Sequence, residues 1–313
     1  MRPIVTLTIN PTIDAFCRTD RVIPVRKVRT HSEHYVPGGG GLNASRMIRE
    51  LGGATVAFYM AGGLTGQALE GMVERTGLAA VRIPMTGLTR VSHVVLEEST
   101  GQEYRFTPEG PDVEEAEWRH CLEVLAVVEA PYVVASGSLA PGIPADFYAQ
   151  VARLVKERGG RMVVDSSGPP LREALAEGVH LIKPSRGELE KLLGRTAASV
   201  AEAEALALEV VASGRAEIVA LTLGAEGAVL ATRDGAIRLS SPKVETRSAV
   251  GAGDAFLGAM MYAMASGQTL PQAFALGVAA GAATAAASGT ALATRVQIEG
   301  LLPEVTVQLA GGS

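Results

Sequence analysis

Apolar, β-branched runs alternate with helical patterns along most of this sequence, and this alternation limits its fold more than any other feature. The runs that predict strands are 3–9, 54–61, 132–136, 161–167, 179–184 and 217–224. The patterns that predict helices are 42–51, 65–76, 114–129, 145–158, 185–194 and 200–213. Several strand runs are apolar throughout, which is typical of a parallel sheet covered by helices on both faces. The alternation therefore predicts an α/β fold with a doubly wound, mostly parallel sheet flanked by helices.

Two segments break this alternation. Residues 12–36 are too polar and irregular for a βα unit of the core, and residues 90–107 have the pattern of a hairpin that turns near 99–101. We expect antiparallel strands in both segments, projecting from the main sheet as a small β lid. No internal repeat and no flexible linker is visible in the sequence, so residues 1–313 are expected to form a single domain with the lid as an excursion.

Charge and cysteine usage exclude several functions. The formal net charge is −5 and no long run of Lys or Arg occurs, which argues against a broad nucleic-acid-binding face. A small anionic substrate stays compatible, because it needs only a local cluster of cations. The two cysteines, Cys17 and Cys121, form no CxxC pair, a pattern that fits a reducing compartment without a disulfide framework.

Hydropathy argues against a membrane protein. The first apolar run is short and is followed by polar residues, so it predicts a strand and not a signal peptide. Residues 278–294 are mostly Ala, Gly, Ser and Thr, too weakly hydrophobic to span a bilayer, and they predict a tightly packed pair of helices. We expect a soluble, cytoplasmic protein that binds neither membrane nor nucleic acid.

Four consecutive glycines, at 38–41, precede a helix expected to begin near Leu42. Bare backbone N–H groups and a helix N-terminus favour a bound anion there. A flexible turn is the alternative, but four glycines carry an entropic cost that a plain turn does not require. A dinucleotide fingerprint does not fit, because Asn43 occupies the third glycine position and no acid ends the strand 54–61. A P-loop does not fit either, since the chain contains no Gly-Lys dipeptide.

A second glycine-rich segment, VGAGDAFLGAMM at 250–261, places Asp254 at the start of another helix. Gly251, Ala252 and Gly253 can present successive N–H groups as an anion hole suited to phosphate. Asp254 could then accept a proton from a hydroxyl while these N–H groups stabilise a phosphoryl group in transfer. The alternative is an N-cap aspartate without a catalytic role.

Together, the two glycine-rich segments resemble the signatures of the ribokinase-like (PfkB) family of sugar kinases, and the resemblance covers nearly the whole chain. The motifs that support it are TLTINPTID (6–14), GGGGLN (38–43), SGSLAPG (136–142), VVDSSG (163–168), IKPSRGEL (182–189), LTLGAEGA (221–228) and GAGDAFLGA (251–259). The pattern is most similar to the branch of bacterial minor 6-phosphofructokinases, 1-phosphofructokinases and tagatose-6-phosphate kinases. Membership would imply a ribokinase-like fold with ATP as phosphoryl donor and Mg²⁺ as cofactor.

The resemblance also implies roles for residues around the sugar. Asp254 matches the catalytic base, and the preceding residues Gly251, Ala252 and Gly253 match the anion hole. The positions that match contacts to the substrate are Asp14, Gly39, Gly40, Asn43 and Ser138. The positions that match cations of the phosphosugar members are Lys27, Arg90 and Arg105. Each of these cations, taken alone, would be read as a solvated surface charge. Their place on both lid segments favours a sugar phosphate, which a guanidinium binds through two parallel hydrogen bonds.

On the nucleotide side, the resemblance implies a further set of contacts. The positions that match ATP contacts are Lys183, Ser185, Thr222, Gly224, Gly227, Ser248 and Val250. Glu188 matches the residue that organises magnesium through water, although Ser185 stands where the family usually has an asparagine. The region 281–291 matches the adenine pocket and a loop for a monovalent cation such as K⁺, with Gly281, Thr284 and Gly289 as candidates. Residue type there offers few side-chain ligands for a cation.

The resulting hypothesis is an ATP-dependent phosphosugar kinase that converts fructose 6-phosphate to fructose 1,6-bisphosphate. The lid strands are expected to pair with those of a second subunit in a homodimer. Three alternatives stay open: a kinase for fructose 1-phosphate or tagatose 6-phosphate, a kinase for nucleosides or unphosphorylated sugars, and a non-catalytic sugar-phosphate sensor. The three lid cations argue against the second alternative, and an intact Asp254 with its glycine segment argues against the third.

Overall fold

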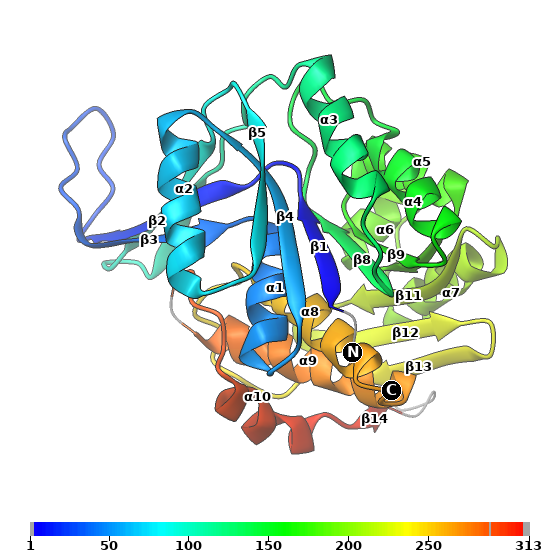
Figure 1. Cartoon of the computed structure of the whole chain (residues 1–313). Helices are drawn as coiled ribbons and strands as arrows, with labels where there is room; N and C mark the ends of the chain where they lie inside the picture. Colours follow the sequence, from blue (N-terminus) through cyan, green and yellow to red (C-terminus); the bar gives the residue numbers. More distant parts are fainter. Residues whose placement is uncertain (1–2, 288, 309–313) are drawn as a thin grey trace.

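A computed structural model describes residues 3–287 and 289–308, and Figure 1 shows a large twisted sheet between helices. The sheet has ten strands in the order β14-β13-β12-β11-β10-β9-β8-β1-β4-β5. Their bounds are β1 Ile4–Thr8, β4 Thr55–Gly62, β5 Ala80–Met85, β8 Tyr132–Ser136, β9 Arg161–Asp165, β10 Val179–Ile182, β11 Ala216–Thr222, β12 Ala228–Thr232, β13 Gly235–Leu239 and β14 Val307–Gln308. The strands from β11 to β5 pair in parallel, whereas β12, β13 and β14 extend the sheet as antiparallel strands. The prediction of a mostly parallel α/β sheet is confirmed.

Helices cover both faces of this sheet. Their bounds are α1 Gly40–Glu50, α2 Gly63–Thr76, α3 Glu115–Ala126, α4 Phe147–Glu157, α5 Gly168–Glu177, α6 Arg186–Leu193, α7 Val200–Ala212, α8 Ala252–Ala265, α9 Leu270–Ala286 and α10 Arg295–Leu301. In β8, consecutive valines point to opposite faces, because side chains alternate along a strand. Val133 packs in the core formed with α3 to α7, and Val134 packs in the core formed with α1, α8 and α9. Both valines are almost fully buried, which is why such strands are apolar throughout.

A separate four-stranded sheet, here called the lid sheet, has the order β3-β2-β6-β7. It consists of β2 Thr12–Thr19, β3 His31–Gly38, β6 Arg90–Glu97 and β7 Gln102–Phe106, and Figure 1 shows β2 and β3 extending away from the main body. The expected antiparallel pairing is correct for β2 with β3 and for β6 with β7, but it is wrong for β2 with β6, which pair in parallel. The reason is that β2 follows β1 and β6 follows β5. Both leave parallel strands of the main sheet at the same edge and therefore run in the same direction.

The late small-residue stretch differs from its prediction. Residues 278–294 do not form a pair of helices, because α9 ends at Ala286 and the chain continues irregularly to α10. Gly289 has φ 65°, and the Thr284 hydroxyl accepts a hydrogen bond from the Ala293 N–H at 3.2 Å, which folds this segment back along the helix. Small residues allowed the close packing of α8 against α9 but did not extend α9.

Strand ends determine where polar chemistry can gather. Ser136 ends β8, Asp165 ends β9 and Thr222 ends β11, while Lys183 follows β10 directly. Because these parallel strands share a direction, their carboxyl ends meet at one edge of the sheet, the usual place for a ligand in such folds. Among the described residues, no helix combines the length and apolar character needed to cross a membrane. The division of the chain into one domain stays a prediction.

Candidate functional site

Asp254 lies in the first turn of α8, with Gly251 as the N-cap in a left-handed conformation, φ 74°. Asp254 is therefore the third residue of the helix and not its N-cap, so the capping alternative is wrong. Its Oδ2 accepts a hydrogen bond from Asn43 Nδ2 at 2.9 Å. Asn43 lies in the first turn of α1, and the carboxylate is thus held between the N-termini of two helices. Both helix ends favour negative charge in the space between them.

The glycine segment at the start of α1 is required by close approaches of polar side chains. A Cβ atom on Gly40 would collide with Ser136 Oγ and would lie 3.1 Å from Asp254 Oδ1. A Cβ atom on Gly38 would collide with the carboxylate of Asp14. The same segment therefore brings bare backbone against both carboxylates, which explains why side chains are absent at these positions.

Asp14 is a buried carboxylate on β2, where the lid sheet leaves the main body. Burial, with the charge of Asp254 as a second cause, raises its pKa to about 6 from an ordinary 3.8, while Arg90 and Arg46 oppose the shift. The charge of Asp254 acts on Asp14, and Asn43 donates a hydrogen bond to Asp254. The two predicted substrate contacts therefore lie in the same electrostatic environment as the predicted base.

We expect Asp14→Asn to raise the free energy of unfolding by about 2–3 kcal/mol above pH 6. A raised pKa means that the native state binds this proton more tightly than the unfolded chain. The wild type is therefore favoured most below pH 3.8 and loses this contribution as pH rises through about 6. Asparagine carries no charge, so the free energy of unfolding of the variant should exceed that of the wild type by an amount that grows between pH 3.8 and about 6 and then stays constant. Urea unfolding from about pH 4 to about pH 8 measures it.

The exposed Asp20 provides the matched control, because Asp20→Asn removes a carboxylate that water solvates. A stability difference for Asp14→Asn that does not change between these pH values would contradict the assignment.

Lys183 and Asp165 form a buried ion pair at the carboxyl edge of the sheet, with Nζ and Oδ1 3.2 Å apart. Burial lowers the pKa of Lys183, but the charges of Asp165 and Asp254 outweigh it and the net pKa is raised. For Asp165, burial raises the pKa to about 6 although Lys183 opposes this. A Cβ atom on Gly253 would lie 3.1 Å from Lys183 Nζ, so the ammonium group lies against the predicted anion hole.

Lys183, which was predicted to contact the nucleotide, thus lies beside the predicted anion hole. At neutral pH the ammonium group is charged and faces the backbone that precedes Asp254. Such a cation can stabilise negative charge on a phosphoryl group beside those N–H groups.

Two functional candidates were missed by sequence reasoning. Asp165 ends a buried strand, and this position next to a parallel-sheet edge is a signal that could have identified it. Arg46 lies one helical turn after Asn43 and donates from Nη1 to Asn43 Oδ1 at 3.1 Å and to the Pro37 carbonyl at 3.3 Å. Burial lowers the pKa of Arg46, with Asp14 opposing. No local sequence signal distinguishes Arg46 from an exposed helix arginine.

The remaining predicted nucleotide residues lie along the same edge. Thr222 and Ser185 pair as an isolated parallel bridge, and the Thr222 N–H donates to the Pro184 carbonyl at 3.0 Å. Ser185 is the N-cap of α6, and its hydroxyl and N–H both donate to Glu188 Oε2, at 2.9 and 2.7 Å. Among the predicted glycines, Gly227 has φ 100°.

Two predicted contacts are engaged inside the protein. The Thr284 hydroxyl is almost fully buried and accepts a hydrogen bond from the Ala293 N–H. The Ser248 hydroxyl donates to Glu103 Oε2 of the lid sheet at 3.3 Å and accepts from the Val250 N–H at 3.3 Å. The candidate cation loop includes residue 288, which lies outside the described residues, while Gly281 packs against the Ala252 carbonyl.

The three predicted lid cations are placed differently from one another. Arg90 donates to the carbonyls of Asn10, Pro11 and Pro108, with its closest contact 2.7 Å from the Asn10 oxygen. Arg105 is exposed and pairs with Glu103 at 2.9 Å. Lys27 is exposed on the connection between β2 and β3 and makes no hydrogen bond or ion pair within the described part of the chain. Of these three lid cations, Arg90 is the one whose charge lowers the pKa of Asp14.

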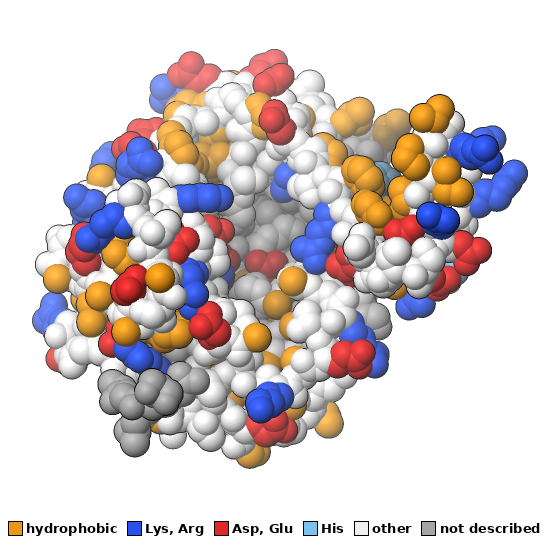
Figure 2. Space-filling model, turned by 180° about the vertical axis from the view of Figure 1, so that it is seen from behind, with side chains coloured by type: hydrophobic (Ala, Val, Ile, Leu, Met, Phe, Trp, Pro, Cys, Tyr) orange, Lys and Arg blue, Asp and Glu red, His pale blue; other side chains and the backbone are white. Residues whose placement is uncertain are grey.

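Ser138 lies just beyond β8 and is exposed. Its Oγ is 3.5 Å from Asn10 Nδ2, the amide that also donates to the Glu109 carbonyl at 2.7 Å. Figure 2 shows a hollow between the main body and the lobe that the lid sheet forms. Asn10 lies two residues before β2 and Ser138 lies two residues after β8, so both lie near the junction of the lid sheet and the main sheet.

Comparison with known proteins decides the family. The model described as "pfkB family carbohydrate kinase" matches residues 5–296. The chain belongs to the pfkB family of carbohydrate kinases. Within the family it is 40% identical over 298 residues to ATP-dependent 6-phosphofructokinase isozyme 2 of Mycobacterium tuberculosis H37Rv, covering 95% of this chain and 88% of that protein. It is 36% identical to the isozyme 2 of Escherichia coli K12, with 92% and 94% covered.

Other pfkB relatives are similar over comparable lengths. The 1-phosphofructokinase of Bacillus subtilis is 30% identical over 305 residues, with 97% of this chain and 99% of that protein covered. The crystal structure of phosphofructokinase-2 from E. coli in complex with potassium superposes with a TM-score of 0.93 at 34% identity, covering 97% and 99% of the two chains. The predicted family and the predicted fold are thus confirmed.

Proposed function

We propose that this pfkB protein is an ATP-dependent phosphosugar kinase whose acceptor is fructose 6-phosphate. The observation that carries the proposal is the Asp254 carboxylate, anchored by Asn43 between two helix N-termini, with Lys183 beside the adjoining backbone. The similarity to two 6-phosphofructokinases over more than nine tenths of the chain supports the acceptor. The main alternative acceptors are fructose 1-phosphate and tagatose 6-phosphate. The similarity to the B. subtilis 1-phosphofructokinase favours fructose 1-phosphate of these two.

The proposed reaction uses a proton transfer and a displacement at phosphorus. Asp254 takes the proton of the sugar hydroxyl, whose oxygen forms a bond to the γ-phosphorus while the bond to the ADP oxygen breaks. The N–H groups of residues 251–253 and the Lys183 ammonium stabilise the charge on the transferring group. Asp14 and Asn43 orient the sugar, so that most of the rate enhancement comes from positioning and electrostatics.

The acidic residues of the nucleotide edge fit a magnesium ion bound with ATP. Mg²⁺ is held in such sites by one or two carboxylates together with water and phosphate oxygens. Glu188 accepts hydrogen bonds from Ser185 through Oε2 alone, which leaves Oε1 available. Asp165 lies close enough to Glu188 for the charge of Glu188 to raise the pKa of Asp165. Within the described residues no group of three or more His, Cys, Asp or Glu side chains could hold a metal ion without other ligands. When bound, the ion would neutralise charge on the phosphates.

We keep K⁺ as a proposed activator, supported by the E. coli structure in complex with potassium. The cytoplasm stays the proposed location. Cys17 and Cys121 are both free thiols, which fits a reducing compartment.

An ADP-release assay with a panel of acceptors tests the proposed function. We expect turnover with fructose 6-phosphate, and lower kcat/KM with fructose 1-phosphate, tagatose 6-phosphate, ribose and nucleosides. No turnover of any phosphosugar would show that the kinase proposal is wrong. Preference for ribose or a nucleoside would instead reject the phosphosugar class.

Arg90 is the lid cation proposed to bind the phosphate of the sugar. We expect Arg90→Ala to raise KM for the phosphosugar about tenfold or more, because a charge-assisted contact to the phosphate is lost. KM for ATP should change far less. Steady-state kinetics with each substrate varied in turn measure both values.

Arg18 offers a matched control for Arg90, since it is a lid arginine paired with the exposed Glu98. Arg18→Ala should leave both KM values near those of the wild type. Equal increases of the two KM values in Arg90→Ala would refute its assigned role and indicate a general disturbance of the carbonyls it contacts.

We also propose a homodimer that buries the exposed apolar residues of the lid. Ile23, Tyr35 and Phe106 are 43%, 57% and 58% exposed, and Figure 2 shows hydrophobic side chains gathered on the lid lobe. Light scattering at micromolar concentration should give twice the chain mass of 32.4 kDa. Tyr35→Glu combined with Phe106→Glu should give the monomer, because charges would have to be buried.

Leu64→Glu serves as the control for the dimer, because Leu64 is 78% exposed but lies on α2 outside the lid sheet. A monomeric wild type, or equal dissociation by the control, would contradict a dimer formed through the lid.

A further inference from the structure

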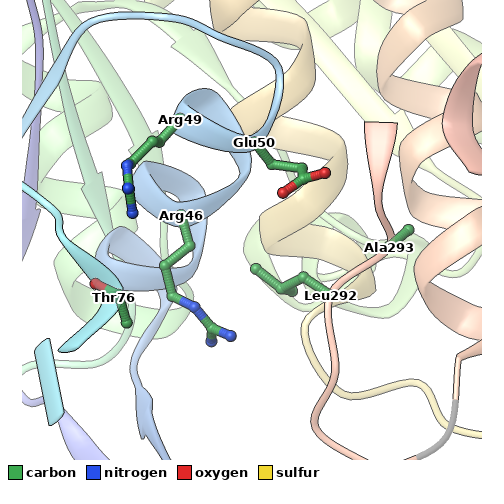
Figure 3. Close-up of a pocket in the computed structure, with 6 residues that line it drawn as sticks. All are labelled: Arg46, Arg49, Glu50, Thr76, Leu292 and Ala293. Atoms are coloured by element: carbon green, nitrogen blue, oxygen red, sulfur yellow. The ribbon is translucent and has the colours of Figure 1, made fainter. Parts of the chain in front are cut away.

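A cavity of about 400 Å³ lies beside α1. Its walls are formed by Arg46, Arg49, Glu50, Thr76, Leu292 and Ala293, and Figure 3 shows how their side chains surround it. Two of these residues, Arg46 and Arg49, are arginines on one face of α1, since residues three apart are neighbours on a helix. We call this space the α1 cavity.

The donors of the α1 cavity are largely unused. The Arg49 side chain makes no hydrogen bond or ion pair within the residues that the structure describes, and its guanidinium lies next to Gly77. Arg46 donates only through Nη1, toward the Pro37 carbonyl and Asn43, so its other N–H groups stay available. Two guanidinium groups with free donors can bind a phosphate group with more than one pair of parallel hydrogen bonds.

The acidic residue of the cavity is already engaged. Glu50 Oε1 accepts a hydrogen bond from the Arg295 N–H at 2.8 Å, which offsets part of its repulsion toward an anion. Leu292 and Ala293 form an apolar wall, and Figure 3 shows them across the cavity from Arg46 and Arg49. Such a wall suits a short carbon skeleton. The volume is large enough for a small phosphorylated metabolite.

The α1 cavity contacts the proposed catalytic site through two of its walls. Arg46 donates to Asn43 Oδ1, and Asn43 in turn donates to Asp254 Oδ2, so one side chain links the cavity to the base. On the opposite wall, Leu292 approaches the anion hole, since its Cδ2 would be 3.0 Å from a Cβ atom on Gly251. An occupant that moves either wall changes the surroundings of Asp254.

We propose that the α1 cavity is an inhibitory site for a small anion that carries one phosphate group. The anion recruits the free donors of Arg46 and Arg49 and turns the Arg46 guanidinium away from Asn43. Asn43 then holds Asp254 less firmly, and kcat falls. The kinetic part of this inference rests on the proposed kinase function, whereas the binding part does not.

Calorimetric titration tests the binding part, with glycerol 3-phosphate and inorganic phosphate as the probes. For the wild type we expect a binding component whose affinity falls about tenfold or more in Arg49→Gln. The affinity should fall by less in Arg49→Lys, which keeps the positive charge but not the paired donors of the guanidinium group. Any binding of these probes at the proposed active site should be the same in all variants. Arg75→Gln is the matched control, because Arg75 is an exposed arginine of α2 that does not line the cavity. Tighter binding of glycerol 3-phosphate than of phosphate would show that the apolar wall contributes.

Identical isotherms for the wild type and Arg49→Gln, or equal weakening in Arg75→Gln, would overturn the site. The kinetic test measures kcat at saturating concentrations of both substrates. Glycerol 3-phosphate should lower kcat about fivefold or more in the wild type and leave Arg49→Gln unchanged. If an anion bound through Arg49 without changing kcat, the coupling through Arg46 would be refuted while the proposed kinase function would stand.

Discussion

Asp254→Asn is expected to lower kcat about a thousandfold. Asparagine keeps the size of the side chain and can still contact Asn43, but it cannot take a proton from the acceptor hydroxyl. The contributions of the anion hole and of Lys183 stay in place, so KM for ATP should change little. The ADP-release assay with fructose 6-phosphate measures kcat, and a thermal melt confirms that the variant is folded.

Exposed Asp112, in the segment before α3, supplies the control, since Asp112→Asn makes the same chemical change away from the site. Full activity of Asp254→Asn would show that the base has been assigned to the wrong residue. A variant that loses activity because it no longer folds would be recognised by its melt, and Asp254→Glu, which displaces the carboxylate by one methylene, would then replace it. Asp254→Glu should also lose most activity, because positioning of the reacting groups is lost.

Gly40→Ala is expected to lower kcat/KM about a hundredfold. The added methyl group would collide with Ser136 Oγ and would lie 3.1 Å from Asp254 Oδ1, so one of these side chains must move. Ser136 donates to Asp165 at 3.2 Å, and Asp165 pairs with Lys183, so a shift of Ser136 also reaches the nucleotide edge. Kinetics with both substrates varied should show losses on the sugar side and on the ATP side.

Gly71→Ala is the matched control for Gly40→Ala. Gly71 lies inside α2, and a Cβ atom there would meet nothing within 4 Å. This control should keep full activity and gain up to about 1 kcal/mol of stability, because alanine favours a helix over glycine. Wild-type kinetics in Gly40→Ala would show that the close approach of backbone to carboxylate is not needed for catalysis.

The sequence predicted the main sheet well because parallel strands buried on both faces have a distinctive composition. It missed strands that lack this composition. β5 is half exposed and contains Pro84, as an edge strand tolerates, and β12 and β13 form a short antiparallel hairpin. It also predicted α9 wrongly beyond Ala286, because small residues carry no signal for where a helix ends. The composition of a segment reports only on its local conformation. The edge strands and the end of α9 depend on tertiary contacts, so the sequence did not predict them.

The sequence predicted those parts of the candidate site that contain a glycine-rich segment. The segments around Gly40 and Asp254 have a local pattern that only close backbone approaches explain, and the structure brings these segments together. Arg46 and the partners of Arg90 had no such pattern, because an arginine has the same local sequence whether it contacts a carbonyl, a carboxylate or water. Glu188 differs from these arginines, since Ser185 and Glu188 have the spacing of a capping box, a local pattern that indicates their interaction.

The hydrogen bond between Asn43 and Asp254 joins residues that are 211 positions apart. During synthesis at about 5–20 residues per second, the first partner leaves the ribosome roughly 10–40 seconds before the second. The glycine segment of α1 is therefore synthesised well before α8, and strands β4 to β13 follow it in the interval. A nascent or truncated chain that ends before α8 lacks Asp254, so under the proposed function it should not carry out phosphoryl transfer. Appearance of activity during translation would accordingly report that α8 has been synthesised and has packed against α1.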